Sequence, residues 1–238
     1  MNNIVVIGSS GAIGSAFIRN FSELYPDAQI FGFSKSNQTS NINNVKFYEI
    51  DYTDENSIAT SAEIASQNAS LDLVIVATGI LHNNELMPEK SMKELSIAKF
   101  QEVILANTVF PAIVGKHFLP KLTKHRRAIF AALSARVGSI SDNQVGGWYS
   151  YRASKAALNM IIKNLSIEMK MRYRESIIVG LHPGTVDSRL SKPFQSNVPV
   201  GKLFTADYSV SKMLEVINTL SPENSGKCYA WDGEEILA

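Results

Sequence analysis

The sequence is poor in cysteine and in unbalanced charge, and it lacks long apolar runs. Cys228 stands alone among 238 residues, so an internal disulfide is excluded and a reducing, cytoplasmic location is expected. Lys and Arg number 23 against 22 Asp and Glu, a net charge of +1. This balance disfavours nucleic-acid partners, because phosphate binding needs many cations on one face. No apolar run approaches the ~20 residues that span a bilayer, so no membrane partner is expected.

The chain is also poor in possible metal sites. Its histidines share no spacing with Cys, Asp or Glu that would suit a metal ion, so we predict none; they are His82, His117, His125 and His182.

Short apolar runs alternate with longer amphipathic segments along the chain. The runs are rich in Val and Ile, as strands buried on both faces are; they cover Ile4–Ile7, Gln29–Phe33, Val45–Ile50, Leu71–Ala77, Ala128–Leu133, Ile177–His182 and Cys228–Trp231. Such alternation implies right-handed βαβ crossovers. The sequence therefore predicts one α/β domain over residues 1–238, a doubly wound parallel sheet of about seven strands with helices on both faces. Residues 185–205 read as one long irregular loop, which is typical of a lid or a binding loop.

Glycines gather at the first strand-to-helix turn, which reads IVVIGSSGAIGSAF. Gly8, Gly11 and Gly14 permit a tight turn and close approach of the backbone to a pyrophosphate at the helix N-terminus. About 20 positions on, an acidic residue would bind a ribose 2′-hydroxyl and favour NAD(H). The sequence has Ser34 and Lys35 there, and this pair favours the 2′-phosphate of NADP(H). NAD(H) is the less favoured cofactor.

Asp51 ends the third predicted strand and is followed by Tyr52. Its carboxylate is placed to accept a hydrogen bond from an adenine amino group. The alternative is a purely local role at the start of the next helix, where Thr53 and Asp54 already offer caps. Both interpretations stay open from the sequence.

Tyr151 and Lys155 lie four residues apart in the run YSYRASKAAL. On a helix this spacing places both side chains on one face. An ammonium group close to a phenol lowers the pKa of the phenol, because it stabilises the phenolate. Tyr151 would then give or take the proton in a redox reaction at a carbonyl or alcohol. The spacing alone is common on helices, so it needs support from elsewhere in the chain.

That support comes from Asn107 and Pro111 in the helical segment ILANTVFPAIVGKHF. Proline has no N–H, so the carbonyl of Asn107 loses its partner and a kink is expected. A buried free carbonyl needs a donor, and an ordered water or the ammonium of Lys155 would serve. A core helix that tolerates a proline is the structural alternative.

Together these motifs resemble those of the short-chain dehydrogenase/reductases, in particular the C-factor-like and sniffer-like carbonyl reductases. The segments GSSGAIG, VATGIL, ANTVFPA, LSARVGSISDNQVGGWYSYRASKAALN and HPGTVDS come in the family's order. The resemblance implies a Rossmann-like fold, a nicotinamide cofactor and hydride transfer to or from a carbonyl or alcohol. It also implies a proton relay from Tyr151 through the ribose and Lys155 to a water on the Asn107 carbonyl. The family often pairs through the helices that carry Asn107 and Tyr151, so a homodimer or homotetramer is consistent with it. Related reductases can be monomers, and the oligomeric state stays open from the sequence.

The resemblance extends the set of cofactor-binding residues beyond the glycine turn, Ser34, Lys35, Asp51 and Tyr52. It adds Ser10, Ala12, Ile13, Ala77, Thr78, Gly79, Asn107, Tyr151, Lys155, Pro183, Gly184 and Val186. Backbone groups of Val186 would meet the nicotinamide carboxamide. Two departures concern this set: Ala12 takes a usual glycine position, and residues 76–79 read Val-Ala-Thr-Gly in place of Asn-Asn-Ala-Gly. Contact of the second segment with the ribose through peptide groups would survive that change.

A third departure concerns the hydroxyl that holds the substrate. The family's catalytic serine aligns with Ala135, and Ser134 matches the serine before it. Successive strand residues face opposite sides, so Ser134 would face away from the site unless a bulge re-aims it. Ser139 and the more remote Ser141 are alternatives, and the absence of any serine role is another. Ser134 is the preferred candidate.

Two functions follow. The first is an NADP(H)-dependent carbonyl reductase acting on a small molecule, with Tyr151 as the proton donor or acceptor. The second is a dinucleotide-binding regulatory or signalling protein of the C-factor type with weak or no turnover, which Ala135 favours. Asn107, Tyr151 and Lys155 argue for the enzyme, because a protein that only binds needs no proton relay.

Overall fold

The computed structural model describes residues 1–36, 38–39 and 42–238. Its main sheet has eight strands in the order β10-β9-β6-β5-β4-β1-β2-β3. The strands are β1 (Asn3–Ile7), β2 (Gln29–Ser34), β3 (Val45–Glu49), β4 (Leu73–Val76), β5 (Ala128–Leu133), β6 (Ser176–His182), β9 (Cys228–Ala230) and β10 (Glu235–Ile236). All run parallel except β10, which pairs antiparallel with β9. The predicted doubly wound parallel sheet is confirmed, with β10 as an additional strand too short to read from sequence.

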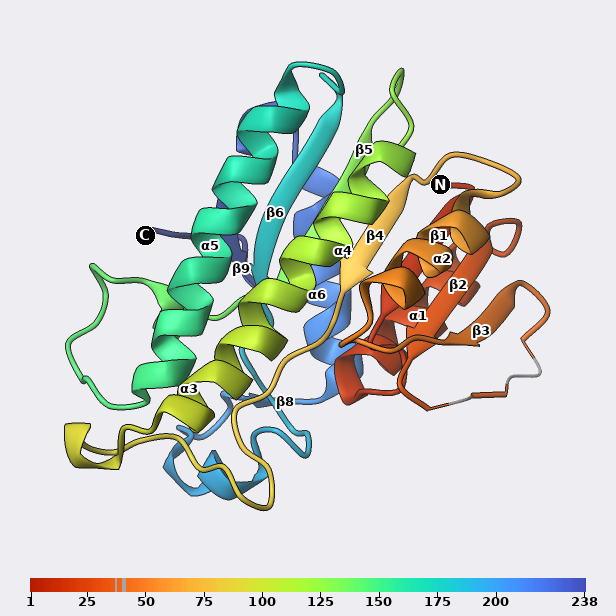
Figure 1. Ribbon diagram of the computed structural model, residues 1–238. Helices are drawn as coiled ribbons and strands as arrows, with labels where there is room; N and C mark the ends of the chain where they lie inside the picture. The colour runs from red at the N-terminus through yellow and green to blue at the C-terminus, as the bar shows by residue number, and fades with distance from the viewer. Residues whose placement is uncertain (37, 40–41) are drawn as a thin grey trace.

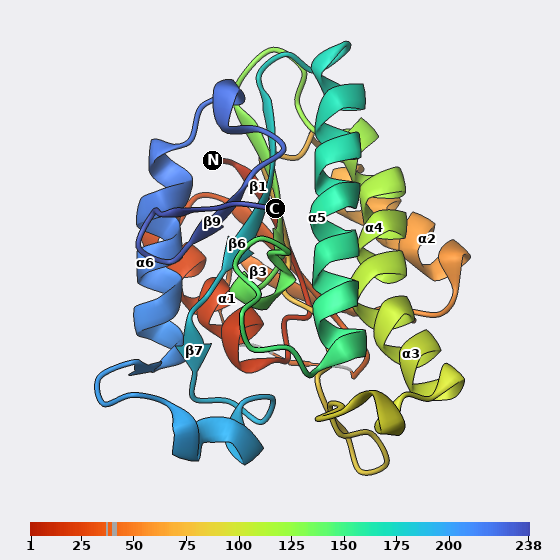
Figure 2. The same cartoon turned by 90° about the vertical axis from the view of Figure 1, so that its left-hand side faces the viewer.

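Helices cover both faces of this sheet (Figure 2). On one face lie α1 (Ala12–Leu24) and α6 (Ala206–Thr219), and on the other lie α2 (Glu55–Ser66), α4 (Phe110–Phe118) and α5 (Tyr149–Lys170). Side chains of successive strand residues point to opposite faces of the sheet. Ile4 and Val6 of β1 pack with α1 and α6, whereas Val5 and Ile7 pack in the cluster that includes α4 and α5. Burial on both sides explains why the strands are continuous apolar runs.

The predicted disturbance before Pro111 takes the form of a π-helical turn. Helix α3 (Ile97–Ile104) continues through η2 (Leu105–Val109) into α4. At the end of this turn the Phe110 N–H donates to the carbonyl of Leu105, five residues back. Single π turns inside helices are frequent at functional sites. The turn contains Asn107, the residue that proline was expected to affect.

The same helical rod, Ile97–Lys121, is long and apolar enough to cross a membrane by length and composition, with a hydropathy of 1.3. Phe110, Val114 and Phe118 on α4 are at most 2% exposed and pack against the sheet. A helix that packs on a core carries such apolarity for its own burial, so the hydropathy is weak support for a membrane span.

The segment 185–205, predicted as irregular, is partly ordered. Strands β7 (Thr185–Val186) and β8 (Leu203–Phe204) pair at its two ends, and η5 (Lys192–Asn197) lies between them. The prediction was wrong on this point, because two-residue strands give no periodic signal. The segment lies with α3 at the lower end of the molecule in Figure 1, where the parallel strands end. The remaining short elements are η1 (Met92–Glu94), η3 (Leu119–Lys121), η4 (Arg136–Gly138) and η6 (Pro222–Asn224).

Candidate functional site

A pocket of about 780 Å³ opens at the carboxyl ends of the central strands. Six parts of the chain line it: the glycine turn after β1, the loop after β4, the end of β5, one face of α5, the loop after β6 and the loop after β7. In doubly wound sheets ligands bind at this edge, because the connections diverge there to the two faces. The predicted residues that line it are Gly11, Ala12, Ile13, Ala77, Thr78, Gly79, Ser134, Tyr151, Lys155 and Pro183.

The glycine turn brings backbone close to backbone. Gly8 has φ +88°, and a β-carbon there would lie 2.8 Å from the carbonyl oxygen of Ala77. A β-carbon on Gly14 would collide with the Gly8 carbonyl. Gly11 is the N-cap of α1, and no side chain of the described residues caps that helix. The free N–H groups and the positive end of the helix dipole therefore face the pocket and fit an anion.

Thr78 supplies a second observation that fits a dinucleotide. Its Oγ1 is buried and has no hydrogen-bond partner among the residues that the structure describes. A buried hydroxyl without a partner is costly unless a ligand satisfies it. Because Thr78 lines the pocket together with the glycine turn, ribose and pyrophosphate oxygens would satisfy both groups.

The four residues predicted to select the nucleotide gather beyond the pocket, at the ends of β2 and β3. Lys35 Nζ lies 5.1 Å from the ring centre of Tyr52. The Asp51 carboxylate accepts hydrogen bonds from the hydroxyl and the N–H of Thr53, which hold its pKa below the usual value, with a smaller contribution from Lys35. Ser34 Oγ donates to the carbonyl of Ser36 at 2.7 Å. Lys35 is thus the group left available for a phosphate.

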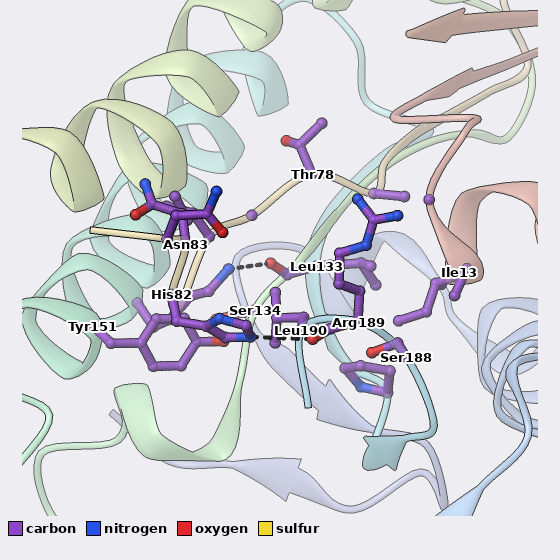
Figure 3. A pocket seen from close by; sticks show the side chains of 18 of the residues that line it. Ile13, Thr78, His82, Asn83, Leu133, Ser134, Tyr151, Ser188, Arg189 and Leu190 are labelled. Carbon is purple, nitrogen blue, oxygen red and sulfur yellow. Dashed lines mark hydrogen bonds between the residues drawn. The ribbon is translucent and has the colours of Figure 1, made fainter. Parts of the chain in front are cut away.

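Tyr151 and Lys155 both lie on α5 and line the pocket. Figure 3 shows the phenol of Tyr151 there. Lys155 is 3% exposed, and its Nζ donates to the carbonyl of Leu133 at 2.8 Å. Burial lowers the pKa of Lys155 to about 8 and raises the pKa of Tyr151 to about 12. The predicted lowering of the phenol pKa by Lys155 is therefore reversed in this arrangement, since desolvation outweighs an ammonium 5.8 Å from the ring centre.

Asn107 lies behind the pocket and is fully buried. Its Oδ1 accepts from the N–H of Ile80 at 2.7 Å, and its Nδ2 donates to the Ile80 carbonyl at 2.8 Å and to Ser154 Oγ at 3.0 Å. A β-carbon on Gly79 would lie 3.3 Å from Asn107 Oδ1 and 3.6 Å from Lys155 Nζ. The π turn thus fixes the loop after β4 against α5, a role of the side chain that the sequence did not reveal.

The serine candidates have hydrogen bonds elsewhere. Ser134 lines the pocket, but its Oγ donates to Asn159 Oδ1 at 2.6 Å. Ser139 Oγ accepts from the N–H of Asp142 at 3.1 Å, and Ser141 Oγ donates to the last carbonyl of the chain at 2.7 Å. Ser134 faces α5, and its proton is used by Asn159. Asn159 was missed, although its position four residues after Lys155 places it on the same helical face.

The loop after β6 is tightly packed. Gly184 has φ +73°, and a β-carbon there would lie 2.6 Å from the ring of Phe204. Val186 is 4% exposed, and its carbonyl accepts from Ser191 Oγ at 2.6 Å. Of the backbone groups expected at a carboxamide, the carbonyl of Val186 is therefore already bonded within the loop.

Two groups of pocket residues were missed from the sequence. One follows β4 and comprises Ile80 and residues 82–85, and the other comprises residues 188–190. His82 Nε2 lies 3.1 Å from the carbonyl oxygen of Arg189, so the two loops meet across the pocket. Both groups follow predicted strand ends, where loops of a parallel sheet converge, and this position was the available signal.

An aromatic wall stands beside Tyr151. The ring centre of Trp148 lies 6.2 Å from that of Tyr151 and 5.1 Å from that of Phe194, which in turn contacts His82. Trp148 has φ +49°, an uncommon conformation for a bulky residue. The backbone and carboxylate of the buried Glu89 accept hydrogen bonds from the turn that begins α5, and they hold Trp148 in place.

His182 ends β6 next to Pro183 and is half-buried. Its Nδ1 has no hydrogen-bond partner within the described ranges. Burial, with a smaller contribution from the positive charge of Arg136, lowers the pKa of His182 to about 4. The folded protein therefore holds this imidazole neutral at pH values where a free histidine is charged.

We expect the free energy of unfolding to fall below pH 6.5 through a contribution that His182→Gln removes. Below pH 6.5 the unfolded chain binds a proton at His182, whereas the folded chain does not. Stabilisation is thus complete above the unfolded pKa and is lost as the pH falls toward 4, at about 1.4 kcal/mol per pH unit. Between pH 7.5 and about pH 5, the free energy of unfolding measured in urea should fall by roughly 2 kcal/mol more in the wild type than in the variant. Equal losses in the wild type and in His182→Gln would contradict this. The matched control is His125→Gln, because His125 is exposed.

The chain is similar to a known enzyme family and to several known proteins. The short chain dehydrogenase family model matches residues 2–199. The C-signal protein of Myxococcus xanthus is 33% identical over 146 residues, 61% of this chain and 82% of that protein. An oxidoreductase of Schizosaccharomyces pombe is 30% identical over 201 residues, 80% of this chain and 77% of its own.

Two solved structures are similar over the full length. NADPH-bound carbonyl reductase from chicken fatty liver has a TM-score of 0.86 at 26% identity and covers 100% of this chain and 99% of its own. Carbonyl reductase Sniffer of Drosophila melanogaster has a TM-score of 0.86, covers 100% of both chains, and at 21% identity shows the fold alone.

Proposed function

Because the chain belongs to the short-chain dehydrogenase family, as its motifs predicted, we propose that it is an NADP(H)-dependent carbonyl reductase. The observation that carries the proposal is the placement of Tyr151 and the buried Lys155 in one pocket with the open N-terminus of α1. The proton donor of the substrate and the turn that would bind the cofactor's pyrophosphate then lie in the same pocket. The chicken carbonyl reductase, with NADPH bound, supports the choice of cofactor.

The cofactor would be held by residues that follow the neighbouring strands β4, β1 and β2. The glycine turn and Thr78 would hold the pyrophosphate and ribose, and Lys35 would hold the 2′-phosphate. When bound, the nicotinamide supplies or accepts the hydride. Lys35 is exposed, and no carboxylate ion pair engages its ammonium in the described part of the chain. This cation supports NADP(H) over NAD(H).

Tyr151 would protonate the oxygen that forms when a carbonyl carbon receives hydride. A phenol with a pKa of about 12 keeps its proton at neutral pH, and Lys155, with a pKa of about 8, is mainly an ammonium there. This state favours reduction, in which the proton moves from Tyr151 Oη to the substrate oxygen while Lys155 stabilises the phenolate left behind. Trp148 and Phe194 would exclude water beside the phenol.

The test is oxidation of NADPH and of NADH, followed by nicotinamide absorbance, against a panel of aldehydes, ketones and quinones. We expect turnover with NADPH and at least about tenfold lower kcat/KM with NADH, as one lost charge-assisted contact produces. Binding of NADPH without turnover across the panel would oppose the reductase assignment. Absence of dinucleotide binding would oppose the site as a whole.

A second candidate is a dinucleotide-binding signalling protein with weak turnover. The similarity to the C-signal protein and the alanine at position 135 favour it. It predicts NADPH binding at normal strength with no substrate in the panel. The retained Tyr151 and Lys155 are the reason to place this candidate second.

We predict that Ala135→Ser raises kcat/KM by about tenfold, whereas Ser134→Ala changes it by less than about threefold. The first variant adds a hydroxyl at the family's serine position, where it would share the substrate oxygen with Tyr151. The second removes a hydroxyl whose proton is used by Asn159. Steady-state kinetics of both variants decide the matter. A large loss in Ser134→Ala, with no gain in Ala135→Ser, would instead assign the substrate hydroxyl to Ser134.

A further inference from the structure

Arg189 enters the pocket from the loop after β7, on the opposite side from the loop after β4. Figure 3 shows its guanidinium extending across the pocket to the side where Thr78 and Ile13 lie. The main chain of the same residue is held in place, since its carbonyl oxygen lies 3.1 Å from His82 Nε2. The backbone thus fixes the loop, and the side chain spans the pocket.

The guanidinium of Arg189 has no ion pair or hydrogen bond with any residue that the structure describes. Arg19, Arg126 and Arg136, by contrast, pair with carboxylates at 2.5 to 2.7 Å. Asp187, two residues before Arg189, accepts a hydrogen bond from Gln195 Nε2 at 2.8 Å. A cation that reaches into a pocket without a partner is a ready ligand for an anion, and its planar fork fits two phosphate oxygens.

The position of the guanidinium selects among possible anions. It reaches toward the side of the pocket that Ile13 lines, which also contains the open N-terminus of α1, so two sources of positive potential act on one region. A 2′-phosphate would lie outside the pocket at Lys35. A carboxylate on the substrate would lie near Tyr151, on the other side of the view in Figure 3. The pyrophosphate is the anion that belongs at the glycine turn.

We propose that Arg189 binds the pyrophosphate of the dinucleotide and thereby holds the loop of residues 187–202 closed over the pocket. The proposal rests on the proposed function, because it requires a dinucleotide at the glycine turn. Since the Arg189 carbonyl also meets His82, the bound cofactor would tie together the loops on both sides of the pocket. Binding of the cofactor would then complete the wall against which a substrate packs.

The first test is calorimetric titration of wild type, Arg189→Gln and Arg172→Gln with NADPH and with 2′-AMP, which has the 2′-phosphate but no pyrophosphate. Arg172 is exposed near the far end of α5 and gives the same change of charge. Arg189→Gln should weaken NADPH binding roughly 10- to 100-fold, as loss of a charge-assisted contact does. Its affinity for 2′-AMP, and both affinities of Arg172→Gln, should stay within about twofold of wild type.

The second test reads the loop itself. NADPH should slow cleavage by chymotrypsin at Phe194 in the wild type and in Arg172→Gln, and it should protect Arg189→Gln much less at equal occupancy. Unchanged NADPH affinity and unchanged protection in Arg189→Gln would overturn the inference and leave the reductase assignment intact. Unchanged NADPH affinity with a raised KM for carboxylate-bearing carbonyls would also overturn it. A wild type that binds no dinucleotide would overturn both proposals.

Discussion

Tyr151→Phe is expected to lower turnover with NADPH by roughly 10² to 10⁴, the usual contribution of a positioned general acid. The variant removes one oxygen and keeps the ring, so the contact with Trp148, 6.2 Å between ring centres, is preserved. With a pKa of about 12, the phenol is fully protonated at neutral pH, so the variant removes a proton donor that is present in the wild type. The measurement is kcat for the best carbonyl substrate, together with the Kd for NADPH, which should change by less than about threefold.

The matched control is Tyr149→Phe, two residues earlier at the start of the same helix. Tyr149 is 39% exposed, and its phenol is not among the groups that line the pocket. Its loss should leave kcat within about twofold of wild type. If Tyr151→Phe retained most of the wild-type turnover, this result would contradict the assignment of Tyr151 as the acid, whatever the effect of the substitution on folding.

Lys155→Met should lower kcat/KM by about 10². An ammonium 5.8 Å from the Tyr151 ring centre stabilises a developing phenolate by about 3 kcal/mol at an effective dielectric constant of 20. The lysine is charged below its pKa of about 8, so wild-type activity should decline as the pH rises through 8. The variant should lack this decline, because it has no group that loses a charge there. A pH profile of kcat/KM from 6 to 10 measures both effects.

Lys163→Met, two helical turns further along α5, is the control for Lys155→Met. Lys163 is exposed and should show neither the loss nor the altered pH profile. Because Lys155→Met also leaves the Leu133 carbonyl without its donor, we expect some destabilisation, about 1–3 kcal/mol. Thermal unfolding separates that loss from the catalytic one. An unchanged alkaline decline in Lys155→Met would show that another group controls it.

Much of the architecture follows from the sequence through local rules. Strands buried on both faces must be continuously apolar, and helices between them must be amphipathic, so the alternation along the chain indicates a doubly wound sheet. Helical periodicity likewise places Tyr151 and Lys155 on one face of α5. Pro111 predicts a disturbed helix at Asn107, since a missing N–H is a property of the residue itself. Each of these inferences concerns neighbours in sequence.

Tertiary structure decided what depends on distant segments and on burial. Ser134 bonds to Asn159, 25 residues away, and this contact fixes the direction of a hydroxyl that strand alternation left open. The Tyr151 phenol has a raised pKa, where the nearby lysine alone predicts a lowered one, because desolvation depends on the whole surrounding fold. His82 and Arg189 meet across 107 positions of sequence. The ends of the predicted strands indicate where loops of a parallel sheet converge, but not which side chains of those loops enter the pocket. Only the folded sheet showed that the Arg189 guanidinium, which has no partner among the described residues, lies in the same pocket as the glycine turn.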